Sequence, residues 1–322
     1  MTPTTPSTPP SVLLLGFGAI GRQVALRLAP EREAGALRLR AAERKVAAHR
    51  DRVLPGVGMV TTGDEAGWPR WEEALAEADL VVECAGVAAA REYGPAVVAG
   101  GTDLVLTSVG ALADPETARR LLAGPGRLWV TAGAIGGFDV LGAAADADGL
   151  DDVRIRTTKV PTSLVQPWMS EAEAATLRAL RPGDEPVTVF AGDPAAAIER
   201  FPANVNVAIG LAWATRGRPA AVGTTPAESA PESTGGQAPA PQDAPGAAEA
   251  ALLQASLERV RVELVADPSV VRSRHEVLAT GPAGRFELSF ESAPSPENPK
   301  TSGLTALSVT RTVREALAAR HG

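Results

Sequence analysis

The stretch VLLLGFGAIGRQVA, from Val12 to Ala25, decides the first part of the fold. Four apolar residues typical of a buried strand lead into three glycines spaced as G-x-G-x-x-G, and a helical pattern follows. This order of strand, glycine turn and helix is the dinucleotide-binding fingerprint. Gly16 would allow the tight turn, Gly18 the approach of a pyrophosphate, and Gly21 the packing of helix on strand.

We therefore predict that this loop binds NAD or NADP, with Ala19 and Ile20 in the same contact. Backbone N–H groups and the positive end of the helix dipole would face the phosphates. The fingerprint also needs an acid about 20 residues further on, for the ribose hydroxyls. Glu43 ends the second strand pattern, and Arg44 beside it could pair with a 2′-phosphate instead. An ordinary solvated carboxylate remains the alternative for Glu43.

Composition limits the class of protein. The chain has 322 residues and 45% hydrophobic content, which suggests two domains. Its net charge of −7 argues against a nucleic-acid or anionic-membrane partner. The single cysteine, the lack of a signal-peptide pattern at the start and the lack of a long apolar run favour a cytoplasmic protein. No His/Cys/Asp spacing suggests a metal site, so none is expected.

The predicted secondary-structure pattern changes near Gly137. Strand and helix patterns alternate over 11–137, which predicts a Rossmann-like, NAD(P)-binding domain with a parallel sheet. Period-2 strand patterns dominate 138–300 and predict a second α/β domain with a mixed sheet covered on one face, to which the family resemblance described below assigns substrate binding and dimerisation. A helix over 301–320, with Thr301 or Ser302 as N-cap, is expected to pack back on the first domain. The strands expected in the second domain are 152–160, 185–192, 258–268, 275–281 and 284–293.

Residues 217–247 stand apart in composition. They hold 11 Pro and Gly in 31 positions, and no Leu, Ile or aromatic residue. Such a stretch cannot offset its ordering entropy by burial, so we predict a disordered surface insertion. A partner-binding tether is the alternative, although no motif supports one.

Three further stretches are too specific to be structural alone: TAGAIGGFDVL (131–141), FPANVNVAIGLA (201–212) and PSPENPKTSGLTALSV (294–309). Together with VVECAG (81–86) and VELVADPSVVRSRHEV (262–277), they resemble the L-aspartate dehydrogenase family. The resemblance runs from Val12 to Leu317, except for 217–247. It implies a homodimer that reversibly deaminates L-aspartate with NAD(P)+, through iminoaspartate, to oxaloacetate and ammonia. It also suggests a link to NAD biosynthesis or aspartate metabolism.

The resemblance also assigns residues. The catalytic histidine falls on His275, and cofactor contacts fall on Ala134 and on either Asn204 or Asn206. Family members carry an Asp-His-Asn-type run just before the histidine, whereas this chain has VVRSRH. That departure leaves the exact substrate open. A reductase for another amino acid or imine, or a non-catalytic cofactor-binding sensor, remains the alternative.

The histidine also stands out without the resemblance. His321 lies near the end of the chain and His49 in an Arg-rich stretch, whereas His275 adjoins a strand and an Asp-Pro turn. Because histidine titrates near neutral pH, it suits proton transfer at a carbinolamine. Deamination should then rise with pH through that titration. The alternative is a half-exposed strand histidine without a catalytic role.

Weaker candidates complete the predicted site. Two substrate carboxylates need cations, for which Lys159, Arg272, Arg274 and Lys300 are available. Lys300 is favoured because it and Thr301 open a helix near the expected site. Ser108 ends a strand and could line the nicotinamide pocket. Cys84 ends another strand over the cofactor, although a small buried apolar role is more usual for cysteine.

Overall fold

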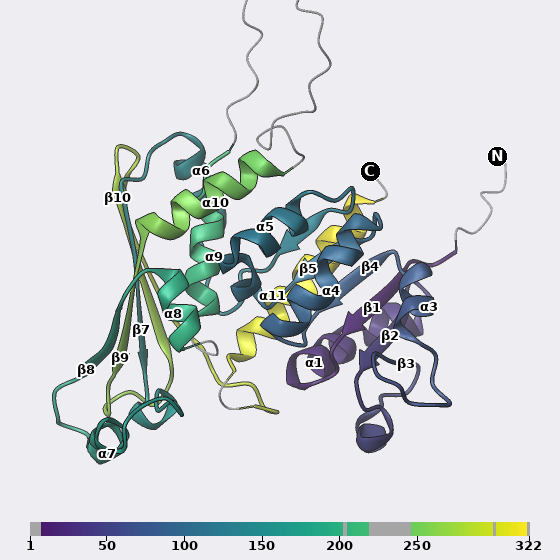
Figure 1. Cartoon of the computed structure of the whole chain (residues 1–322), viewed down its shortest axis with the longest axis horizontal. Coiled ribbons are helices and arrows are strands. Elements are labelled where there is room, and N and C mark those ends of the chain that lie inside the picture. The colour runs from purple at the N-terminus through teal and green to yellow at the C-terminus, as the bar shows by residue number, and fades with distance from the viewer. Residues whose placement is uncertain (1–7, 202–204, 219–245, 299–300, 321–322) are drawn as a thin grey trace, which may run out of the picture.

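The computed structural model describes residues 8–201, 205–218, 246–298 and 301–320, arranged around two sheets (Figure 1). The first sheet is parallel, with strand order β3-β2-β1-β4-β5-β6. It confirms the Rossmann-like fold, and the order reverses at β1 and β4, where such sheets bind ligands. Its strands are β1 (Ser11–Leu15), β2 (Arg38–Glu43), β3 (Gly58–Thr61), β4 (Leu80–Glu83), β5 (Asp103–Leu106) and β6 (Leu128–Val130).

The connections of this sheet are helical. They are α1 (Ala19–Arg27), α2 (Ala29–Glu33), η1 (Ala47–Arg52), α3 (Trp71–Ala76), α4 (Val87–Ala99), η2 (Val109–Ala113) and α5 (Pro115–Leu122). Local chemistry sets their ends: Asp114 caps α5 by accepting a 2.8 Å hydrogen bond from the Thr117 amide, and Pro115 follows. The short β3 and α3 were not expected from the sequence. The apolar pattern TDLVLTSVGAL predicts a strand over 102–112, but β5 ends at Leu106 and the 3-10 helix η2 follows from Val109.

The second sheet is mixed, in the order β11-β10-β7-β9-β8, as expected. Only β7 and β9 pair in parallel; the other neighbours are antiparallel. The strands are β7 (Asp152–Lys159), β8 (Val187–Gly192), β9 (Val260–Ala266), β10 (Arg274–Gly281) and β11 (Gly284–Glu291). The helical segments are α6 (Phe138–Asp146), η3 (Pro161–Ser163), α7 (Glu171–Ala179), α8 (Pro194–Arg200), α9 (Asn206–Ala214) and α10 (Ala247–Arg259).

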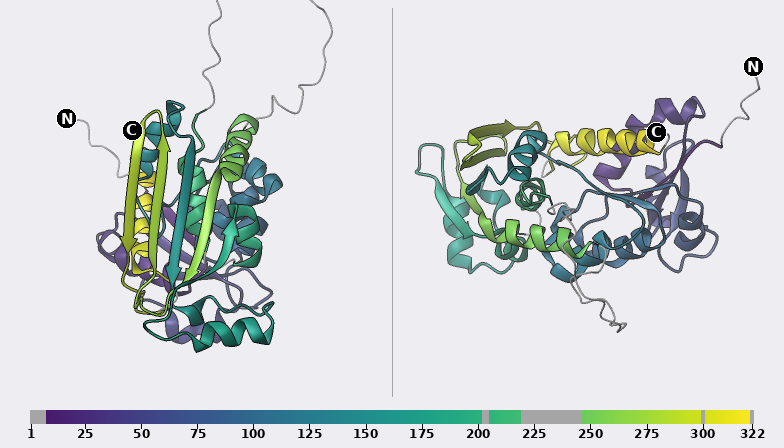
Figure 2. Two further views of the ribbon diagram at one scale, coloured as in Figure 1. Left: turned by 90° about the vertical axis from the view of Figure 1, so that its left-hand side faces the viewer. Right: turned by 90° about the horizontal axis from the view of Figure 1, so that it is seen from above.

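The second sheet is covered on one face. Helices α6, α8, α9 and α10 lie between it and the first sheet in Figure 1, and Figure 2 (left) shows the opposite face uncovered. The alternation follows this arrangement: His275, Val277 and Ala279 of β10 are buried. On the open face, Arg156 and Glu263 form an ion pair at 2.7 Å. The period-2 pattern therefore predicted the faces correctly.

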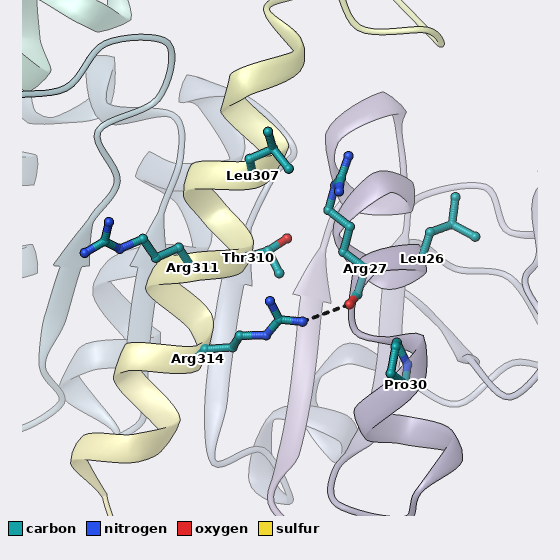
Figure 3. A pocket seen from close by; sticks show the side chains of 7 residues that line it. All are labelled: Leu26, Arg27, Pro30, Leu307, Thr310, Arg311 and Arg314. Carbon is teal, nitrogen blue, oxygen red and sulfur yellow. Dashed lines mark hydrogen bonds between the residues drawn. The ribbon is translucent and has the colours of Figure 1, made fainter.

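Helix α11 (Gly303–Ala319) returns to the first sheet. Val309 and Val313 are fully buried in the same cluster as Val12 and Leu14 of β1. Of the two N-cap candidates, Ser302 is the cap, since its Oγ accepts the Leu304 amide at 3.1 Å. Helix α11 runs beside α1, where the Arg314 guanidinium donates to the Arg27 carbonyl oxygen at 3.1 Å (Figure 3). The C-terminal helix thus joins the first sheet to the loop after β11.

Most of the predicted insertion, 219–245, lies outside the described residues. Its last residues do not: Gly246 is the N-cap of α10, and Ala247 is the first residue of that helix. The sequence reasoning missed α10, as well as α6 and α8. No helix in the described part of the chain is long and apolar enough to cross a membrane.

Candidate active site

The glycine loop between β1 and α1 has the shape that a dinucleotide requires. Gly16 has a φ of +97°, which favours glycine, and a Cβ there would lie 2.8 Å from Ala85. A Cβ on Gly21 would lie 2.2 Å from the Gly16 carbonyl oxygen. A Cβ on Gly18, in contrast, would have no atom within 4 Å. The loop therefore opens at Gly18, where a pyrophosphate can approach the backbone.

The first turn of α1 is also suited to an anion. Its N-cap is Gly18, which carries no side chain to cap the helix, so the N–H groups of the turn can face a ligand. Ala19 and Ile20 are half-buried in this turn. Glu43 is half-buried at the carboxyl end of β2, the strand that pairs with β1, while Arg44 is exposed. These residues fit the phosphates and the adenosine ribose of NAD or NADP.

Glu83 ends β4 on the other side of the glycine loop and is fully buried. Its Oε1 accepts from the amides of Ala85 (2.7 Å) and Gly86 (2.8 Å) and from the Ser108 hydroxyl (2.9 Å). Its Oε2 accepts from the Ser108 amide at 2.8 Å. Burial raises the pKa of Glu83, and these hydrogen bonds oppose that rise. The sequence reasoning missed this residue.

Ser108 and Cys84, two predicted site residues, lie beside this carboxylate. The Ser108 side chain is 7% exposed, and its hydroxyl is used in the bond to Glu83. The Cys84 Sγ lies 3.8 Å from Thr107 Oγ1, and burial raises the pKa of the Cys84 thiol. Cys84 is therefore a neutral thiol at the end of β4.

His275 lies on the covered face of the second sheet and is 5% exposed. Its Nδ1 is 2.9 Å from Oγ1 of Thr157, which is opposite it on β7. Lys159, two residues beyond Thr157 on the same face of β7, is 8% exposed. The structure therefore brings the predicted base and one predicted substrate cation together.

The charge state of this pair corrects the sequence-based expectation. Burial, with the nearby Lys159 charge, lowers the pKa of His275 to about 4. Burial lowers the pKa of Lys159 to about 8. The imidazole is thus neutral and the amine mostly charged at pH 7, so the histidine titration expected near neutral pH lies well below it.

Two contacts join the second sheet and its covering helices to the loops at the carboxyl ends of the first sheet's strands. The Asn206 Oδ1, at the start of α9, accepts the Gly110 amide at 3.0 Å and so ties α9 to η2. Ala134 is 8% exposed in the loop after β6, and a Cβ on Gly136 in that loop would lie 3.5 Å from the ring of Phe290. Phe290 pairs with His275 across β10 and β11. The loop after β6 therefore lies near the histidine.

Known families match both parts of the chain. The model of the aspartate dehydrogenase C-terminal domain matches 139–228 and 237–316, and that of the homoserine dehydrogenase NAD-binding domain matches 16–124. The L-aspartate dehydrogenase of Brucella anthropi is 32% identical over 316 residues, which cover 96% of this chain and 97% of that protein. The L-aspartate dehydrogenase of Methanosarcina acetivorans is 33% identical over 252 residues, 76% of each chain.

This chain belongs to the aspartate dehydrogenase family. The crystal structure of aspartate dehydrogenase from Thermotoga maritima, 23% identical, shares the fold with a TM-score of 0.58 over 97% of each chain. The sequence reasoning held 217–247 to be foreign to the family, but the family match leaves out only 229–236 of that segment.

The remaining predicted residues of this aspartate dehydrogenase homologue fall in different places. Asn204 and Lys300 lie outside the described residues. Thr301 is half-buried, and its carbonyl oxygen accepts the Ser295 amide at 2.7 Å. Arg274 precedes His275 on β10, faces the opposite side of the sheet and lies 3.5 Å from Glu276, while Arg272 lies 3.9 Å from Glu291. The two arginines therefore do not join the histidine.

The surface hollow between α1 and α11 includes neither residues of the glycine loop nor the His275–Lys159 pair. It is lined by Leu26, Arg27, Pro30, Leu307, Thr310, Arg311 and Arg314 (Figure 3). Leu26 and Arg27 are at the end of α1 that is remote from the glycine loop. Among the described residues no cluster of His, Cys, Asp and Glu could hold a metal ion.

Proposed function

We propose that this chain is an NAD(P)-dependent L-aspartate dehydrogenase that forms iminoaspartate, which water converts reversibly to oxaloacetate and ammonia. The observation that carries the proposal is the buried His275–Lys159 pair, in a family member whose glycine loop fits a dinucleotide. Bound NAD(P)+ supplies the acceptor for the hydride that leaves the substrate Cα.

The chain's own residues would bind and orient the cofactor. The first turn of α1, with Gly16, Gly18 and Gly21, would bind the phosphates, and Glu43 would accept from the ribose hydroxyls. A carboxylate there repels a 2′-phosphate, so we expect NAD to be preferred, with Arg44 allowing some use of NADP. Ala134 and Asn206 would contact the nicotinamide half.

His275 would act as the acid and base of the hydrolytic steps. Its neutral imidazole can take a proton from the water that attacks the imine carbon and return it to the departing amine. For Nε2 to accept that proton, Nδ1–H must donate to Thr157 Oγ1, which lies at hydrogen-bond distance. Thr157 therefore orients the ring.

Lys159 would bind a carboxylate of the substrate. An ammonium in a buried position forms a strong, charge-assisted hydrogen bond with a carboxylate. The negative charge of the substrate would also offset the repulsion between Lys159 and a protonated His275. Binding of a dicarboxylate would thereby let His275 hold a proton during turnover. Ser108, Lys300 and Thr301 remain further substrate candidates.

We also propose a cytoplasmic homodimer that serves NAD biosynthesis or aspartate metabolism. The single cysteine and the net charge of −7 support the location. The uncovered face of the second sheet offers a self-complementary surface of arginines and carboxylates, such as Arg156 and Glu263. Light scattering at several protein concentrations measures the oligomeric state.

A substrate panel tests the proposed function. The purified protein should oxidise NADH or NADPH only when oxaloacetate and ammonia are both present. Faster turnover with another keto acid would support a dehydrogenase of a different amino acid. Cofactor binding without turnover on any keto acid would support the sensor.

A further inference from the structure

We infer that Glu83 is a positioning residue for the nicotinamide end of the cofactor. Its carboxylate ties the loop after β4 to the turn after β5, and both segments follow the carboxyl ends of strands beside the switch point of the first sheet, where such sheets bind ligands. The inference rests on the proposed function only in requiring that the glycine loop bind a nicotinamide dinucleotide.

The strand order assigns the two halves of the cofactor to opposite sides of β1. Glu43 on β2 marks the adenosine side, and the glycine loop after β1 takes the pyrophosphate. The nicotinamide half must then extend over the ends of β4 and β5, on the other side of β1. Glu83 and Ser108 stand there.

The contacts of Glu83 form part of a continuous path across the site. Ala85, whose amide Glu83 accepts, packs so closely on Gly16 that a Cβ there would lie 2.8 Å away. Ser108, bound by both carboxylate oxygens, begins the turn whose Gly110 amide binds Asn206 of α9. Glu83 therefore links the phosphate loop to the helix that carries a proposed nicotinamide contact.

The complete burial of the Glu83 carboxylate is consistent with a role in fixing the backbone around it. A fully buried acid is costly unless hydrogen bonds compensate, and Glu83 has four, from the loop after β4 and from the turn after its neighbour β5. An apolar residue would leave the amides of Ala85, Gly86 and Ser108 without this acceptor. The carboxylate thus fixes the backbone at the place where the nicotinamide would lie.

Glu83→Gln tests the inference with little change of shape. An amide has one acceptor oxygen, so if it keeps the bonds to Ala85 and Gly86, its NH2 group faces the Ser108 amide and that tie is lost. We expect the dissociation constant of NADH to rise about tenfold, the loss typical of a hydrogen bond to a charged group. The dissociation constant of ADP-ribose, which lacks the nicotinamide, should stay within about twofold of the wild-type value.

Asp103→Asn is the matched control. Asp103 also accepts from the next segment, binding the Arg127 amide at 2.9 Å and the Trp129 indole at 3.3 Å, but it begins β5 at the opposite edge of the sheet. This variant should have a lower melting temperature, but the ratio of the dissociation constant of NADH to that of ADP-ribose should not change. Ser108→Ala, which keeps the carboxylate and its amide contacts, should raise the same ratio by about threefold.

The outcomes separate this inference from the proposed function. If Glu83→Gln raises both dissociation constants by the same factor, or changes neither, Glu83 does not position the nicotinamide end. If Glu83→Gln does not fold, Ser108→Ala decides, and an unchanged ratio contradicts the inference. If the wild-type protein binds neither NADH nor ADP-ribose, the proposed function itself fails.

Discussion

At the scale of single residues, the charge state of the His275–Lys159 pair governs the proposed chemistry. Before substrate arrives, burial and the neighbouring ammonium keep the imidazole neutral. A neutral imidazole can act as a base at once, but it can act as an acid only after it has taken up a proton. The carboxylates of aspartate would provide the negative charge that stabilises that proton.

His275→Asn should lower kcat by about 10²–10⁴-fold in both directions, the usual contribution of a positioned acid or base. NADH affinity should not change, because the glycine loop lies on the other sheet. Steady-state kinetics and NADH fluorescence titration on the same preparation measure the two effects. A folded variant with kcat within about threefold of wild type would leave His275 as a strand residue only.

The lowered pKa of Lys159 predicts how the binding of a dicarboxylate depends on pH. Succinate, which lacks the amine of aspartate, should bind best below pH 8, where Lys159 is charged, and more weakly as pH rises through its pKa of about 8. The inhibition constant of succinate against aspartate measures this. Lys159→Met should bind succinate weakly at every pH, and an unchanged pH profile in that variant would remove Lys159 from the carboxylate site.

At the scale of elements, two glycines of the glycine loop should respond differently to substitution: a side chain at Gly18 should weaken only cofactor binding, and one at Gly21 should also lower stability. Gly18 has an extended backbone with open space around its Cα, whereas Gly21 packs against the Gly16 carbonyl. Gly18→Ala should therefore fold with wild-type stability yet bind NADH at least tenfold more weakly, by about 1.4 kcal/mol. The measurements are a thermal melt and a fluorescence titration.

Gly21→Ala is the matched comparison for that prediction. Its Cβ would lie 2.2 Å from a backbone oxygen, so it should destabilise the protein by about 1–3 kcal/mol as well as weaken binding. Equal losses of stability in Gly18→Ala and Gly21→Ala would show that the open space at Gly18 is not a ligand site.

The elements also show what the sequence could predict. Most strands of the two sheets were predictable because buried runs and period-2 alternation leave a direct signal, as in β1 and β10, whereas the four-residue β3 was missed. Helix α10 was missed because its Ala-rich start, AAEAALL, follows a Pro/Gly-rich stretch without a break in composition. Glu83 was missed because glutamate is rarely fully buried; the signal was one acid inside the apolar run LVVECAG.

At the scale of the whole molecule, the returning helix α11 and the loop before it connect the two sheets. Glu297 in this loop accepts a hydrogen bond from the Gln23 amide nitrogen at 3.0 Å and lies 3.3 Å from Arg22, both in the first turns of α1. Glu297 thus fastens this loop to the helix that follows the glycine loop. The pairing of distant segments here could not be read from local patterns.

The predicted insertion can be tested by deletion. Removing 219–245 and joining Arg218 to Gly246 with a short Gly/Ser link should leave activity within a few-fold, since loop length costs about 0.6 kcal/mol per doubling. A deletion that extends through Ala247 should be less stable, because Gly246 has a φ of +75° and caps α10. Loss of soluble, active protein in the shorter deletion would show that the fold needs the segment.

The most direct test of the account follows the hydrogen on the substrate Cα. With L-aspartate deuterated at Cα and NAD+, we expect one deuterium in the reduced nicotinamide for each oxaloacetate formed, and none with deuterated D-aspartate. Mass spectrometry of the reduced cofactor measures the label. Absence of deuterium from NADH during turnover of L-aspartate, or no turnover of L-aspartate by folded protein that binds NADH, would contradict the proposed hydride transfer.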